Sequence, residues 1–164
     1  RMCLDVLCDE EAHADQQVQR MTEAMQRLAA RQRHKKKVRL MRTVPGVGPV
    51  TAMTFQTELI DPHRFDDGGQ VAKMIGLTPG VRESGERRRE GPLLKTGNWR
   101  LRTALVEAAW RWVNKDPTAK ATFGRLVRNT GDVKKAIVGM ARRLAIILWR
   151  LVTREQPYRL RLAA

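Results

Sequence analysis

The sequence is poor in cysteine and has no long apolar run, and these two shortages exclude several classes of protein. Its two cysteines, Cys3 and Cys8, are too few for a disulfide scaffold and favour a reducing, intracellular setting. Together with His13 they follow a five-residue spacing that fits no common zinc site, so we expect no metal bound by this chain. No apolar stretch is long enough to cross a membrane, and no secretory signal is visible. We therefore expect a soluble, cytoplasmic protein without a membrane partner.

Acidic residues are also scarce relative to basic ones. The chain of 164 residues has 32 Lys and Arg against 17 Asp and Glu, which gives a formal charge of +15 and a pI near 11.1. Such a charge points to a polyanionic partner, and nucleic acid is the first candidate. The acids lie at predicted caps, turns and helix faces, and none forms the strand-borne carboxylate pair that would hold two magnesium ions.

The first quarter of the chain is free of glycine and proline. Apolar residues at Val18, Met21, Met25 and Leu28 predict an amphipathic, coiled-coil-like helix from about Glu10 to Met41. Its apolar seam favours pairing with a second copy, and its end beyond Ala30, which is basic without any acid, favours a surface that faces phosphates. A solvated lone helix remains the alternative. Because the chain opens on Arg1 directly into this helix, we expect it to be part of a longer protein, with residues 1–42 as a helical linker.

A turn rich in glycine and proline follows this helix. The run from Val44 to Ala52 matches the helix-hairpin-helix pattern over residues 43–60, in which main-chain amides grip a DNA phosphate without reading sequence. Gly46 and Gly48 are the candidate nucleic-acid-binding residues. A simple turn between two helices is the alternative.

The rest of the chain predicts an all-α domain over residues 43–164. Apolar periods and cap residues predict helices at about 50–60, 68–75 and 98–114. A shorter helix should end near Gly131, and a core helix should begin after Asp132. The helix at 98–114 and these two are expected to form a bundle over 98–154. The tryptophans at 110, 112 and 149 lie in or beside apolar stripes, so we interpret them as packing residues. His63 has no nearby ligand-type neighbour and is expected at the surface.

One interval, Gly76 to Arg102, shows no sustained helical or strand period. It carries seven basic residues against three acids around a single serine, Ser84. A long loop of this kind in a compact domain is typically functional, and a small β-hairpin before Leu94 is compatible with its sequence. Its excess positive charge predicts contacts with a phosphate backbone from Arg82, Arg87, Arg88, Arg89, Lys95, Asn98, Arg100 and Arg102.

Several short motifs occur together in this chain. Val-Pro-Gly-Val-Gly at 44–48, Gly-Leu-Thr-Pro at 76–79, Ser84-Gly85, Lys-Thr-Gly-Asn-Trp-Arg-Leu-Arg at 95–102 and Ala108-Ala109 appear in order. Through these motifs the segment from about Arg42 to Tyr158 resembles the C-terminal domain of the bacterial insertion-sequence transposases of the 110/116/902 group. The resemblance implies a nucleic-acid-guided DNA recombinase with guide RNA and DNA as partners. It also implies an upstream, resolvase-like domain whose four acids hold magnesium, a domain that this chain lacks.

The resemblance also implies a role for one serine. The family's Arg-x-Ser-Gly context falls on Arg82 to Gly85, which makes Ser84 the nucleophile that links covalently to a DNA end. The active site would then be composite, with metal supplied by the missing domain, and this chain alone would bind nucleic acid without cutting it. Two other readings stay open: a non-catalytic helix-hairpin-helix module that binds DNA or a junction, and a tyrosine recombinase using Tyr158. The arginine and histidine constellation of the latter is not recognisable here, and Tyr158 more simply marks the end of the last helix.

Overall fold

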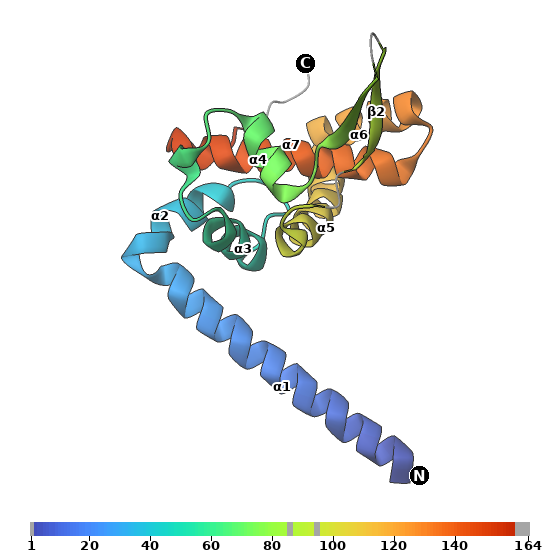
Figure 1. The fold of residues 1–164 in the computed structure, drawn as a ribbon. Helices are drawn as coiled ribbons and strands as arrows, with labels where there is room; N and C mark the ends of the chain where they lie inside the picture. Colours follow the sequence, from blue (N-terminus) through green and yellow to red (C-terminus); the bar gives the residue numbers. More distant parts are fainter. Residues whose placement is uncertain (1, 85–86, 94–95, 160–164) are drawn as a thin grey trace.

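The computed structural model describes residues 2–84, 87–93 and 96–159 (Figure 1). Apart from one two-stranded hairpin its regular structure is helical, which confirms the predicted all-α class. In chain order the elements are α1 (Met2–Ala30), α2 (Gln32–Met41), α3 (Pro49–Leu59), the short 3-10 helix η1 (Pro62–Arg64), α4 (Gly68–Ile75), β1 (Pro79–Ser84), β2 (Arg87–Leu93), α5 (Trp99–Lys115), α6 (Pro117–Thr130) and α7 (Val133–Thr153).

The last helix, α7, is the centre of the body. Its apolar residues recur at helical spacing, and Met140, Leu144 and Leu148 are completely buried. Helices α2, α4, α5 and α6 all pack against α7, while α3 packs against α5. The apolar pattern that begins after Asp132 therefore predicted the core helix correctly.

Side-chain caps set where most of the body helices begin. The Asp67 carboxylate accepts a hydrogen bond from the Gln70 amide at 2.8 Å and opens α4. Asp132 accepts one from the Lys134 amide at 2.7 Å and opens α7. Each such cap stabilises its helix by about 1 kcal/mol.

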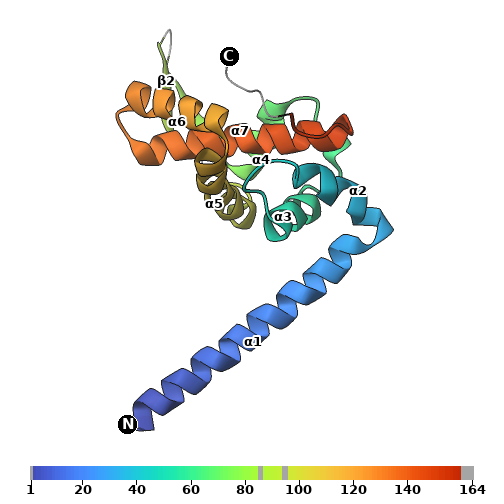
Figure 2. The ribbon, with the colours of Figure 1, turned by 180° about the vertical axis from the view of Figure 1, so that it is seen from behind.

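The N-terminal helix is where the sequence-based prediction was wrong in its bounds. The helix begins at Met2 rather than near Glu10, and it breaks at Arg31, whose φ of −63° and ψ of 145° are extended. Beyond the break α2 buries Val38 and Met41 in the core, whereas α1 leaves the body (Figures 1 and 2). Docking of α2 thus decides the break, and no glycine or proline marks it in the sequence.

The interval without a sustained period contains an antiparallel hairpin, which the sequence analysis allowed for without placing its strands. Strands β1 and β2 pair from Pro79 opposite Leu93 to Ser84 opposite Arg87. Among the described residues the hairpin makes no extensive contact with any helix, and it rises away from the body (Figures 1 and 2). Neither strand alternates apolar and polar residues, so the sequence shows no strand period here.

None of the helices that the structure describes combines the length and the apolar character needed to span a lipid bilayer.

Candidate nucleic-acid interface

Gly46 lies in the turn between α2 and α3, pressed against the backbone of α5. Its φ of +88° is left-handed, and a Cβ there would lie 2.6 Å from the Trp112 amide nitrogen and 2.7 Å from the Arg111 carbonyl carbon. Glycine is therefore required at this position by packing alone. Gly48 differs, because a Cβ there would meet nothing within 4 Å.

The same turn leaves main-chain donors without partners. Within the part of the chain that the structure describes, the amides of Gly46 and Gly48 donate no hydrogen bond. Gly48 is the residue before α3, Pro49 opens that helix, and the Gly48 carbonyl accepts the Ala52 amide at 3.0 Å. The two predicted nucleic-acid-binding residues of this turn, Gly46 and Gly48, thus lie beside a helix N-terminus, whose partial positive charge favours anions.

The β-hairpin carries most of the other predicted site residues. Its register pairs the Cα of Ser84 with that of Arg87, Glu83 with Arg88, and Arg82 with Arg89. Residues two apart in a strand share a face, so the positions of Ser84, Arg82, Arg87 and Arg89 fall on one face of the hairpin and that of Arg88 on the other. Lys95 lies outside the described residues.

Asn98 has a structural role at the start of α5. Its side-chain oxygen accepts the Leu101 amide at 3.0 Å, and its side-chain nitrogen donates to the Glu58 carboxylate on α3. Its own amide donates to the Met74 carbonyl at 3.2 Å. Asn98 therefore ties α5 to α3 and α4, and its side-chain amide is already occupied within the chain.

An exposed aromatic side chain next to Asn98 was missed as a site candidate. Trp99 is 63% exposed, and the Arg100 guanidinium lies 5.8 Å from its ring centroid. Arg102, one turn further, is half-buried. By contrast Trp112 is buried, Trp149 donates to the Pro62 carbonyl at 2.8 Å, and Trp110 packs edge-on against Phe123. The signal for Trp99 was its position at the first residue of α5, before the apolar pattern of that helix begins.

A buried acid holds the corner between α5 and α6. Asp116 accepts hydrogen bonds from Trp112 Nε1 at 3.0 Å, Tyr158 Oη at 2.7 Å, and the amides of Thr118 and Ala119 at 2.9 and 3.2 Å. Burial acts most strongly on its pKa and would raise it. The four hydrogen bonds together outweigh burial, so the pKa of Asp116 lies below its ordinary value.

Tyr158 fastens the C-terminal segment to the body. Its amide donates to Thr43 Oγ1 at 2.8 Å, and its ring packs edge-on against Trp112 with 6.4 Å between centroids. Burial, the hydrogen bond to Asp116 and the charge of that carboxylate raise the pKa of Tyr158 to about 12. A phenol so held resists deprotonation and is a poor candidate nucleophile.

Replacing Tyr158 with phenylalanine is expected to lower the free energy of unfolding by about 1–2 kcal/mol near neutral pH, because one hydrogen bond to a buried carboxylate is lost. The raised pKa favours the neutral phenol in the folded state, so its stabilisation is present below the ordinary pKa of 10.0 and is lost as the pH rises towards about 12. Urea unfolding of both proteins across this range should show the difference between them shrinking. A difference that stayed constant would contradict the Tyr158–Asp116 interaction.

The described residues contain no group of three or more His, Cys, Asp or Glu that could hold a metal ion.

The fold and charge define a strongly basic helical domain, and comparison with known proteins identifies its family. A family model described as the transposase IS116/IS110/IS902 family matches residues 38–124. The chain is 31% identical over 122 residues to a transposase for insertion sequence element IS1111A of Coxiella burnetii, covering 73% of this chain and 34% of that protein. It is 34% identical over 118 residues to putative transposase y4rJ of Sinorhizobium fredii, covering 69% and 30%. A probable family 20 transposase of Pseudomonas aeruginosa is 33% identical over 128 residues, covering 75% and 37%.

The chain belongs to the IS116/IS110/IS902 family of transposases. This confirms the resemblance drawn from the short motifs. The chain spans about a third of the length of these curated relatives.

Proposed function

We propose that this chain is the nucleophile-bearing, nucleic-acid-binding part of a transposase that exchanges DNA strands, with Ser84 attacking a DNA phosphodiester. Membership of the transposase family supports the reaction class. The observation that carries the proposal is the hairpin register, which gathers the positions of Ser84, Arg82, Arg87 and Arg89 on one face of a projecting element.

This arrangement suits attack by a hydroxyl on a phosphodiester. The Ser84 oxygen forms a bond to phosphorus while the bond from phosphorus to the leaving 3′ oxygen breaks. The serine proton passes to a base, and the leaving oxygen takes up a proton. Arginines on the same face offset the charge of the phosphate oxygens and hold the backbone, because a guanidinium binds phosphate through paired N–H donors.

The base and the metal are assigned to the part of the protein outside this chain. The described residues do not fit a magnesium ion, since they contain no cluster of ligands. The missing acidic domain would hold magnesium and complete a composite site, in the same protein or on another subunit. This chain alone then binds nucleic acid without cutting it.

The turn between α2 and α3 supports binding that does not depend on sequence. The unbonded amides of Gly46 and Gly48 and the start of α3 supply donors for a phosphate, as in a helix-hairpin-helix. Such contacts give affinity, and sequence choice is left to base pairing with a guide RNA.

Helix α1 supports assembly with a second copy. Val18 and Met21 are 63% and 70% exposed, and Leu4, Leu7 and Leu28 continue the same seven-residue repeat with exposed side chains. Met25 packs against the body of its own chain instead. An exposed apolar seam on a helix that leaves the body is typical of a coiled coil.

The proposal is tested by joining this domain to the upstream part of its protein and supplying magnesium, guide RNA and labelled DNA. We expect a covalent protein–DNA adduct on a denaturing gel, and its loss when magnesium is chelated. Tight, salt-sensitive binding without an adduct would contradict the proposal and favour the non-catalytic DNA- or junction-binding module.

A further inference from the structure

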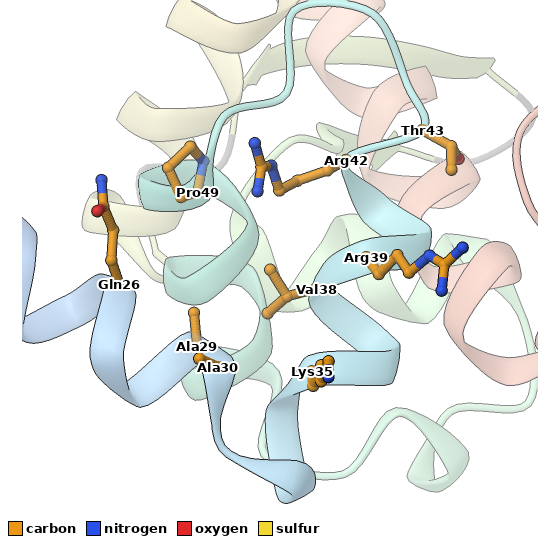
Figure 3. A pocket seen from close by; sticks show the side chains of 9 residues that line it. All are labelled: Gln26, Ala29, Ala30, Lys35, Val38, Arg39, Arg42, Thr43 and Pro49. Atoms are coloured by element: carbon orange, nitrogen blue, oxygen red, sulfur yellow. The ribbon is translucent and has the colours of Figure 1, made fainter.

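The break at Arg31 creates a basic hollow in the elbow between α1 and α2. The hollow has a volume of about 660 Å³, within the range of small-ligand sites. Figure 3 shows α1 on one side, α2 on the other and the first turn of α3 between them, with the lining residues Gln26, Ala29, Ala30, Lys35, Val38, Arg39, Arg42, Thr43 and Pro49. The small Ala29 and Ala30 leave the space open, and Val38 is buried beneath it.

Three cations of this hollow lie on α2 and at its C-terminal end. The positions of Lys35, Arg39 and Arg42 follow one another at spacings of four and three residues. In Figure 3 the Arg42 side chain extends towards Pro49, whereas that of Arg39 extends to the other side of α2. All three are exposed, and no carboxylate in residues 2–84, 87–93 or 96–159 forms an ion pair with any of them. Lys36 is different, because it pairs with Glu155 at 2.5 Å.

A second hollow of about 360 Å³ adjoins the first and shares Ala30, Lys35 and Arg39 with it. The concave surface therefore runs around the outside of α2 rather than ending in one pocket. The positive end of α3 meets it at Pro49. An open basic trough, with unpaired charges at regular intervals, suits a repeating anion better than a single small one.

We propose that this elbow holds the phosphodiester backbone of a nucleic acid, as a second contact separate from the Ser84 hairpin. The inference rests on the proposed function and extends it. The hairpin rises from the opposite side of the body in both views (Figures 1 and 2), so a strand in the elbow lies away from the reacting phosphate. The elbow contributes affinity and position, and the chemistry stays at the hairpin.

The test compares two triple variants of matched charge in the full-length protein. One changes Lys35, Arg39 and Arg42 to glutamine, and the control changes Lys120, Arg125 and Arg128 on α6 to glutamine. All six side chains are exposed, so both variants should fold, which circular dichroism checks. Binding is measured against salt with a duplex DNA and with a stem-loop RNA of equal length.

The elbow variant should bind about tenfold or more weakly, with a salt slope shallower by about 2–3, while the α6 variant stays near the native protein. Weakening with one probe assigns the elbow to that nucleic acid, and weakening with both assigns it to the shared backbone. Adduct formation per bound complex should be unchanged. Equal behaviour of the two variants would overturn the inference and leave the proposed function standing, whereas no binding by the native protein would overturn both.

A second pair of variants adds charge instead of removing it. Ala30→Glu places a carboxylate in both hollows, and Ala30→Gln adds a neutral side chain of the same size. The glutamate variant should bind both nucleic-acid probes several-fold more weakly than the glutamine variant, because the new carboxylate repels the negatively charged phosphates. Equal affinities of these two variants would also overturn the inference.

Discussion

Replacing Gly46 with alanine is expected to lower the free energy of unfolding by about 3 kcal/mol or more. The new Cβ would lie 2.6 Å from the Trp112 amide nitrogen and 2.7 Å from the Arg111 carbonyl carbon. Both are backbone atoms, which no change of rotamer can move. The left-handed φ of +88° adds a cost of about 1–2 kcal/mol for a residue with a side chain. For a chain of this size the expected fall in melting temperature is roughly 6–12 °C.

Gly48→Ala is the matched control, two residues away in the same turn. A Cβ there is free of contacts, and its φ of −87° suits alanine. Its free energy of unfolding should change by about 1 kcal/mol or less, mainly because alanine is a weaker helix N-cap than glycine. Thermal and urea unfolding of the two variants measure the comparison directly, and equal stabilities would contradict the close packing of Gly46 on α5.

The pair also separates two reasons for a glycine in this turn. Both residues keep their amides when changed to alanine, so a phosphate bound by main-chain donors should survive Gly48→Ala. Loss of nucleic-acid affinity in a folded Gly48→Ala protein would mean that the backbone must approach the ligand more closely than a methyl group permits.

Ser84→Ala in the full-length protein should abolish the covalent protein–DNA adduct, a loss of about 10³-fold or more in strand exchange. The hydroxyl is the only group removed and it carries no charge, so DNA affinity should stay within about twofold, since affinity depends mainly on phosphate contacts. Adduct formation on a denaturing gel and binding by titration are measured on the same preparation.

The exposed Thr96 supplies the control for that experiment. Thr96→Ala removes another surface hydroxyl between the hairpin and α5, and its adduct yield should match that of the native protein. Normal strand exchange by Ser84→Ala would remove Ser84 from the chemistry. Loss of activity in both variants would point to a general defect of this region instead.

Local chemistry made much of the body predictable. Asp67, Asn98 and Asp132 are cap residues directly before apolar helical periods, and each does open a helix. The core helix α7 follows from its apolar repeat alone. The caps and the apolar repeat depend on residues that are close together in the chain, so they can be recognised from the sequence alone.

The features that depend on distant contacts were not predictable. The break at Arg31 depends on where α2 docks, and the Asp116 network needs Tyr158, 42 residues further along the chain. A small hairpin was compatible with the sequence, but its strands could not be placed because neither alternates apolar and polar residues. The motif identified Ser84 as a candidate, but the alignment of its position with Arg82, Arg87 and Arg89 needed the register.

The extended residue at Arg31 also makes α1 a lever. Its 29 residues extend for about 43 Å, and its contacts with the body involve its last turns, through Met25 and Ala29. A rotation of about 10° at the joint would swing the far end by about 7 Å for an arm of that length. Because the walls of the elbow come from both α1 and α2, we expect a nucleic acid held there, as proposed above, to fix the angle between the two helices. If α1 pairs with a second copy as proposed, such a rotation would change the distance between the two subunits by several ångströms.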